Sequence, residues 1–126
     1  MLVLIFCSCK KDGANTSNTS NTNTNSPVDV YVAGYEYDGS NGTIAVAKYW
    51  KNGQGTPITY GSINSFANSI AVSNSNVYIA ETSLGAAVWS SAFSSTGFFG
   101  GSSQQSGTNS ITVVGADYFV AGYDYK

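Results

Sequence analysis

One short segment occurs three times in this chain of 126 residues, and this repetition constrains the fold more than any other feature. The copies are DVYVAGYEYD at 29–38, NVYIAETSLG at 76–85 and DYFVAGYDYK at 117–126. A second motif precedes the later two copies, as NSIAVSNSN at 68–76 and NSITVVGAD at 109–117. The copies are spaced by 47 and then 41 residues, and the extra length falls in the turn-rich loop YDGSNGT at 37–43. We therefore expect a chain that builds its core by stacking similar units.

Each unit is expected to contain about four short strands. Those of the first unit are predicted near Val30–Tyr37, Ile44–Trp50, Thr56–Tyr60 and Asn68–Ser73. Only 10% of the residues are charged, and tyrosine, valine, glycine and asparagine are abundant, which is typical of β-structure joined by turns.

Tight turns are expected at 52–53, 74–75 and 115–116, and the glycine-rich segment TGFFGGSS at 96–103 is predicted to be a loop. Val30 and Val32 alternate with Tyr31 and Ala33, so both faces of this strand are apolar and suit packing on both sides.

Four strands in about 40–45 residues are the usual content of one β-propeller blade. The predicted fold is therefore all-β, with antiparallel four-stranded blade-like repeats at 28–75 and 76–116 and the start of a third at 117–126. This partial β-propeller has about two blades plus one strand, whereas a closed ring needs at least about four. We expect a fragment of a longer repeat protein; the alternatives are self-association through open sheet edges and an open pair of packed sheets.

The N-terminal residues have the composition of an export signal. An apolar run at 2–6 precedes FCSC, and Ser8 is a small residue directly before Cys9. This arrangement resembles a bacterial lipoprotein processing box, and the following CKKD resembles lipoproteins of the Bacteroidetes. The resemblance implies lipidation at Cys9 and attachment to the outer membrane, on its periplasmic or surface face. The alternative is a buried apolar N-terminal strand.

The signal segment is assigned to residues 1–9, with a truncated n-region, and a disordered tether rich in Asn, Thr and Ser to residues 10–27. The units after the tether resemble propeller-like repeats of Bacteroidetes lipoproteins, in the pattern VYVAGYEY, AKYWKNG and ANSIAVS. This resemblance covers residues 28–126.

Few residues suited to catalysis are present. Histidine is absent and the two cysteines lie in the signal segment, so no catalytic triad, metal site or cofactor is predicted. The net charge of −2 and the absence of arginine argue against nucleic-acid binding. Asp29 and Asp117 recur beside strand starts, which favours a structural role at turns.

Aromatic side chains are the candidate ligand contacts, because tyrosine and tryptophan stack on sugars and anchor protein interfaces. The residues selected are Tyr35, Tyr37, Trp50, Trp89 and Tyr123. The alternative is that they serve mainly as packing within the sheets.

The sequence thus predicts a lipid-anchored binding module of the cell envelope that recognises a glycan or a protein and has no catalysis of its own. One alternative is a fragment of a carbohydrate-active propeller enzyme whose catalytic carboxylates lie on absent blades or among Glu36, Glu81 and Asp124. The other is a purely structural or non-functional truncated repeat protein.

Overall fold

The computed structural model describes residues 6–9, 28–38, 42–93, 95–99 and 106–125 and contains only strands and their connections there. The strands are β1 (Phe6–Cys9), β2 (Val30–Tyr37), β3 (Ala45–Lys51), β4 (Gln54–Pro57), β5 (Phe66–Ser73), β6 (Asn76–Thr82), β7 (Ala86–Ser90), β8 (Ser95–Phe99), β9 (Ser106–Val114) and β10 (Asp117–Asp124). Within these residues no helix has the length and apolar character needed to cross a membrane. The predicted all-β class is confirmed.

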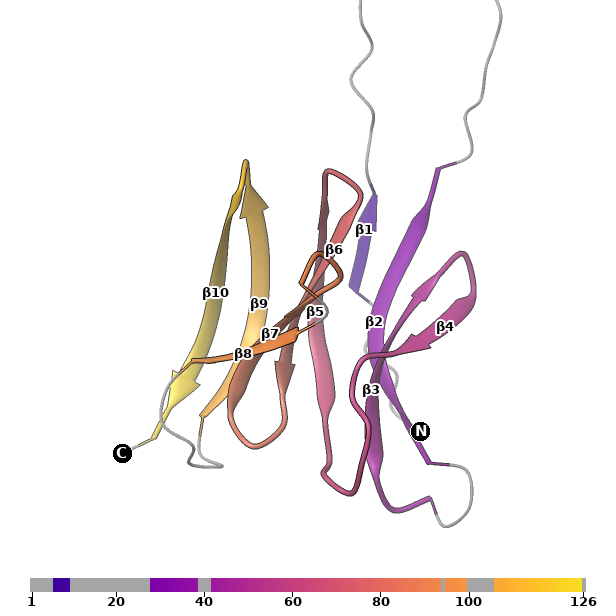
Figure 1. The fold of residues 1–126 in the computed structure, drawn as a ribbon, viewed down its shortest axis with the longest axis vertical. Coiled ribbons are helices and arrows are strands. Elements are labelled where there is room, and N and C mark those ends of the chain that lie inside the picture. Colours follow the sequence, from indigo (N-terminus) through magenta and orange to yellow (C-terminus); the bar gives the residue numbers. More distant parts are fainter. Residues whose placement is uncertain (1–5, 10–27, 39–41, 94, 100–105, 126) are drawn as a thin grey trace, which may run out of the picture.

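Three antiparallel sheets are formed from strands in chain order. Sheet A has the order β1-β2-β3-β4, sheet B the order β5-β6-β7-β8, and sheet C consists of β9 and β10. The sheets lie beside one another across Figure 1, with sheet B in the middle. Over the described residues they do not close into a ring.

Local turn chemistry explains why consecutive strands pair. Asn52 and Gly53 join β3 to β4 with φ values of 52° and 85°, and Asn74 and Ser75 join β5 to β6 with 48° and 66°. Positive φ at both central residues is what a type I′ hairpin turn requires. Gly115 begins the third predicted turn, between β9 and β10, with φ 63°. All three predicted turns are therefore confirmed.

The grouping of strands differs from the sequence prediction in two places. The predicted fourth strand of the first unit, Asn68–Ser73, does not join sheet A but lies in β5, the first strand of sheet B. The two-residue turn at 74–75 binds it to β6, whereas a longer connection separates it from β4. In addition, residues 96–99 of the predicted loop form most of β8, which pairs with β7.

The hydrophobic core has two layers, one on each side of sheet B. Between sheets A and B lie Tyr31, Ala33, Ala47, Ile58, Ala67, Ile70, Val77 and Ile79. Between sheets B and C lie Tyr78, Ala80, Val88 and Ile111. Strand β6 contributes alternate residues to the two layers, so five of its seven residues are buried. Packing on both faces was predicted for Val30–Tyr37 but is found in sheet B instead; in β2, Tyr31 and Ala33 are buried, whereas Val30 is 42% exposed.

Strand β1 takes the position in sheet A that β5 takes in sheet B. Phe6 pairs with Ala33, and Ser69 pairs with Ala80, the residue that corresponds to Ala33 in the next copy. The segment predicted to be the end of an export signal therefore contributes backbone pairs to β2. The remainder of that signal and the predicted tether at 10–27 lie outside the described residues.

Candidate binding groove

A groove of about 500 Å³ lies where the three sheets meet. Its walls include residues of all three sheets: Tyr35 from sheet A, Phe66, Asn68 and Thr82 from sheet B, and Asn109 and Tyr123 from sheet C. None of the residues that line it carries a carboxylate or an ammonium group. The groove is thus formed by aromatic rings, amides and hydroxyls.

Two β-bulges place the asparagines at this groove. In sheet B the pairing with β6 passes from Ala67 directly to Ser69, which leaves Asn68 outside the register. In sheet C the pairing with β10 likewise leaves Asn109 outside the register. Both asparagines begin the repeated motif Asn-Ser-Ile. A bulge redirects a side chain out of the ordinary alternation, and here it does so at the same position of two repeats.

Asn68 connects sheet B to sheet C through its amide group. Its Nδ2 donates to Thr82 Oγ1 at 2.9 Å and to the carbonyl oxygen of Thr108 at 2.9 Å. The backbone N–H of Thr108 donates in turn to Thr82 Oγ1 at 3.0 Å. Two further bonds join the sheets, from Ile111 N to Ser69 Oγ at 3.2 Å and from Ala86 N to Ser106 Oγ at 3.0 Å. The bonds among Asn68, Thr82 and Thr108 lie at the groove, because all three residues line it.

Asn109 has the same position on sheet C but a different environment. It is exposed, and its side-chain amide forms no hydrogen bond with another described residue. The amide can therefore donate to and accept from a ligand in the groove. Sequence reasoning did not single out either asparagine, although their repetition in Asn-Ser-Ile was the signal that could have identified them.

The aromatic candidates separate into two groups. Tyr35 and Tyr123 both line the groove, and the Tyr35 ring packs edge-on against Phe66 with the centroids 5.0 Å apart. Tyr37 packs edge-on against Tyr35 at 5.7 Å and extends this aromatic cluster outward, with 52% of its surface exposed. The structure thus brings together three of the five predicted ligand contacts.

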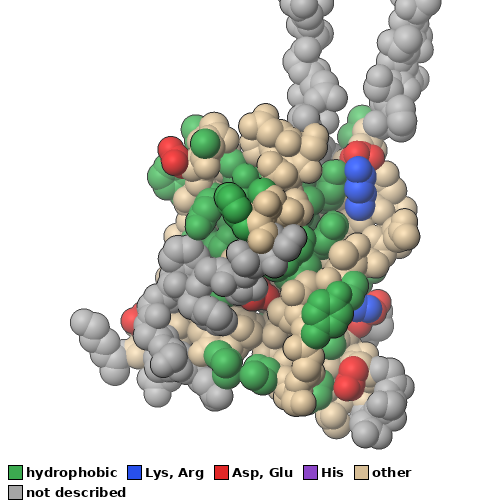
Figure 2. Space-filling view, in the orientation of Figure 1, with side chains coloured by type: hydrophobic (Ala, Val, Ile, Leu, Met, Phe, Trp, Pro, Cys, Tyr) green, Lys and Arg blue, Asp and Glu red, His purple; other side chains and the backbone are tan. Residues whose placement is uncertain are grey.

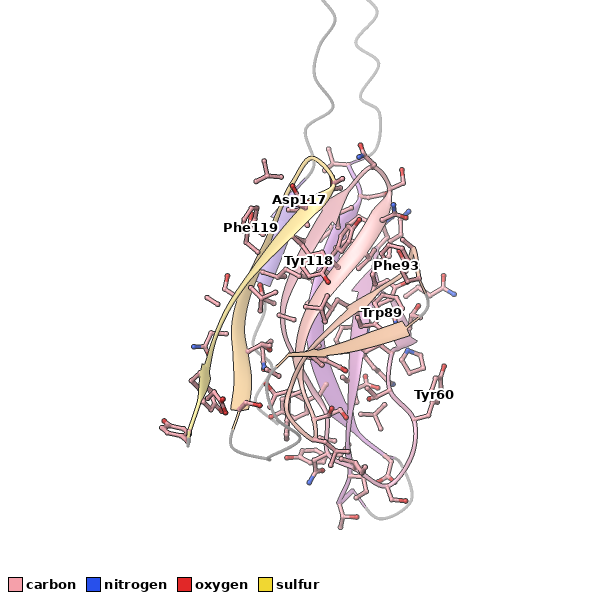
Figure 3. All side chains as sticks on the ribbon, turned by 60° about the vertical axis from the view of Figure 1, so that its left-hand side comes forward. Tyr60, Trp89, Phe93, Asp117, Tyr118 and Phe119 are labelled. Carbon is pink, nitrogen blue, oxygen red and sulfur yellow. The ribbon has the colours of Figure 1, made fainter. Side chains whose placement is uncertain are left out.

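The two tryptophans lie elsewhere and occupy equivalent places in their sheets. Val32 pairs with Trp50, and Ile79, the residue that corresponds to Val32, pairs with Trp89. Trp89 packs on Tyr49 of sheet A, with centroids 5.6 Å apart. It lies on the opposite side of the molecule from Phe119 in Figure 3. It is therefore a packing residue between sheets A and B.

Trp50 stabilises the pairing of β3 with β4 in sheet A, where it pairs with Gly55. Its indole ring lies over Gly55, where a Cβ atom added to the glycine would come within 2.8 Å of Nε1, so only glycine fits beneath it. Tyr123 covers Gly107 of the neighbouring strand in the same manner, with 2.6 Å from the hypothetical Cβ to the hydroxyl. An aromatic ring over a cross-strand glycine is a known device for stabilising sheet edges.

Two of the acidic residues, Asp29 and Glu36, each pair with a lysine. Asp29 Oδ1 accepts a hydrogen bond from Asn52 Nδ2 at 2.7 Å, and Oδ2 lies 2.9 Å from Lys51 Nζ. The bonds from Lys51 and Asn52 lower the pKa of the Asp29 carboxyl below its usual value. Asp29 therefore holds the turn between β3 and β4, in line with the structural role predicted for it. Glu36 of β2 pairs with Lys48 of β3.

The three carboxylates considered for catalysis are distributed over all three sheets. Glu81 is 1% exposed and lies between Ala67 and Ala87 in the register of sheet B. Glu36 belongs to β2, and Asp124 lines a second cavity of about 430 Å³ between sheet C and Ala86. Neither of these two cavities is lined by Glu36 or Glu81. Within the described residues, no group of three metal-ligating side chains occurs.

Figure 2 shows hydrophobic side chains reaching the surface at several places, between large areas of backbone and other uncharged side chains. Few charged side chains are visible in this view.

Comparison with protein-family models, curated proteins and solved structures finds no match to this chain. The proposed function therefore rests on the geometry of the groove and of the residues that line it.

Proposed function

We propose that this protein is a binding module of the cell envelope whose groove between the three sheets receives a neutral glycan. The observation that supports this most directly is the composition of the groove. Tyr35, Phe66 and Tyr123 supply aromatic surface, Asn109 supplies an amide, and no charged group lines the walls. Sugars present apolar C–H faces and many hydroxyls, so they suit aromatic rings combined with amides.

The arrangement of strands favours a wider interpretation of the fold. Sheets A and B each contain four antiparallel strands in chain order, and each packs face to face on its neighbour, as blades do in a β-propeller. We propose that the sheets are blades of a propeller-like protein and that the groove lies on the side where the innermost strands meet. In propellers this is a common location for ligands, because loops and inner strands of several blades converge there.

A binding assay on the full chain tests the glycan proposal. We expect selective signals on a glycan array and, for any glycan that binds, a loss of affinity of at least about fivefold in Tyr35→Ala and Tyr123→Ala, since truncating an anchor residue costs more than about 1 kcal/mol. Trp50→Ala is the matched control, because Trp50 is aromatic but lies outside the groove. Equal losses in all three variants, or no signal on neutral glycans, would argue against the groove as the site.

We further propose that a lipid on Cys9 attaches the module to the outer membrane. The proposal is supported by the small residue Ser8 before Cys9 and by the lysine pair after it. Cleavage before Cys9 would remove three of the four residues of β1 and would free the edge of β2 that they cover. Labelling with an alkyne fatty acid in cells that export the protein tests this: the label should be absent from Cys9→Ala and present in Cys7→Ala, and the reverse pattern would refute the assignment.

A further inference from the structure

We propose that the outer edge of β10 binds an extended strand of the β3 type, which carries two lysines three residues apart. Strand β10 pairs with β9 on one side only, and its other edge has no neighbour among the described residues. All of its residues are exposed, and Phe119 points away from the rest of the molecule in Figure 3. The inference does not depend on the glycan proposal, because it concerns a different surface.

An unpaired edge offers a row of backbone N–H and C=O groups to any extended segment. Backbone groups alone would accept strands of many sequences. The identity of the partner therefore has to come from side chains, and here the internal repeats supply it. Strand β10 corresponds to β2 residue by residue, since Asp117, Phe119 and Asp124 match Asp29, Tyr31 and Glu36.

In sheet A, Asp29 just before β2 and Glu36 within β2 pair with the two lysines of β3, the next strand of the sheet. Lys51 pairs with Asp29 at 2.9 Å, and Lys48 pairs with Glu36. Because Lys48 and Lys51 are three residues apart, they lie on opposite faces of β3, as Asp29 and Glu36 do on the facing segment. The Lys51 ammonium also lies 5.4 Å from the centre of the Tyr31 ring. The pair of charges thus fixes the register between the two strands.

Sheet B lacks both the acids that correspond to Asp29 and Glu36 and the lysines that correspond to Lys48 and Lys51. The residues of the second copy that correspond to Asp29 and Glu36 are Asn76 and Ser83, which are neutral. The residues of β7 that correspond to Lys48 and Lys51 in the strand register are Ala87 and Ser90, which are neutral too. At the positions of Asp29 and Glu36, acids are therefore matched by lysines on the outer strand in sheet A, whereas sheet B has neither; its one acid, Glu81, lies at the position of Gly34.

The third copy restores the acids. Asp117 and Asp124 are exposed, and within the described part of the chain neither forms an ion pair. Two carboxylates at these positions match a strand of the β3 type and not one of the β7 type. In an antiparallel pairing with the β2–β3 register, one lysine would meet Asp117 beside Phe119 and the other would meet Asp124.

The chain itself provides matched peptides for a test. The probe is a biotinylated peptide with the sequence of residues 45–52, AVAKYWKN, and the control is the equivalent segment 84–91, LGAAVWSS. Each is titrated against the full chain by biolayer interferometry at low salt. We expect the lysine peptide to bind about two- to thirtyfold more tightly than the control, since two exposed charge pairs each contribute modestly, and we expect this preference to shrink in 1 M salt.

Charge reversal then tests the assigned contacts. The variant D117K/D124K should lose the preference for the lysine peptide and should prefer a peptide that carries Lys48→Glu and Lys51→Glu. Hydrogen exchange of the wild-type chain with the lysine peptide should slow in residues 117–125. The proposal is overturned by equal affinities for the 45–52 and 84–91 peptides, by a preference unaffected by charge reversal, by protection confined to sheet A, or by no saturable binding of either peptide at about 1 mM.

Discussion

The hydrogen bonds of Asn68 predict a large difference between two asparagines that are equivalent in sequence. In Asn68→Ala the bonds from Nδ2 to Thr82 and to Thr108 are lost, and both acceptors lie in a partly buried region between sheets B and C. With a net value of about 0.5–1.5 kcal/mol for each bond, the free energy of unfolding should fall by about 1–3 kcal/mol. For a domain of this size, the midpoint of thermal unfolding should drop by about 4–8 °C per kcal/mol.

Asn109→Ala is the matched control. Its amide occupies the same bulge position but forms no side-chain hydrogen bond with another described residue, so the loss should stay within about 0.5 kcal/mol. Urea and thermal unfolding are followed by tryptophan fluorescence and by circular dichroism, and an unchanged urea slope is required for the comparison. A cycle with Thr82→Val should give a coupling energy of at least about 0.5 kcal/mol with Asn68→Ala. Equal losses in the two alanine variants would refute the assignment of Asn68 as the connection between the sheets.

Three further predictions follow from individual contacts. Trp89→Ala should reduce the free energy of unfolding by about 2–4 kcal/mol, because it removes the aromatic contact with Tyr49 between sheets A and B. Trp50→Ala should reduce it by less. Chemical unfolding followed by circular dichroism measures both losses. Gly122→Ala would place a Cβ atom 2.2 Å from the carbonyl oxygen of Gly107 and should open the β9–β10 hairpin. Gly115→Ala has free space around it and should cost only about 1 kcal/mol for its positive φ. Hydrogen exchange in residues 106–125 distinguishes the two variants. The pKa of Asp29 is lower in the folded chain than in the unfolded chain, so its stabilising effect is complete above the unfolded pKa and is lost as the pH falls through the folded pKa. The difference in unfolding free energy between wild type and Asp29→Asn should therefore shrink toward acid pH. A difference that stays constant with pH would contradict the cause given for the shift.

Much of the local structure could be predicted from the sequence because it depends on neighbouring residues. The Asn52-Gly53 turn and the strand at Val30–Tyr37 are examples, since positive φ and two-residue alternation are local properties. The grouping of strands into sheets was wrong because a repeat has a period but no marked beginning. Loop length could have supplied that beginning, as the two-residue turn at 74–75 joins β5 to β6 and a longer loop separates β5 from β4.

The candidate site was less predictable, because its residues come from three sheets. Tyr35 and Tyr123 are in the same groove only because sheets A, B and C stack in a particular order, and nothing in either segment specifies that order. The equivalence of Trp50 and Trp89 was hidden for a related reason. They are 39 residues apart while their partner strands are 47 apart, so the shorter loop before β7 shifts the sequence spacing without shifting the register.

The stacking of sheets built from consecutive strands has a consequence for how such a protein grows. Each sheet forms its strand-to-strand backbone ladder within itself and makes its main apolar contacts with the adjacent layer. Gene duplication can therefore lengthen the molecule by whole layers, and each added layer should contribute a similar increment of stability, in proportion to length and without reorganising the layers already present.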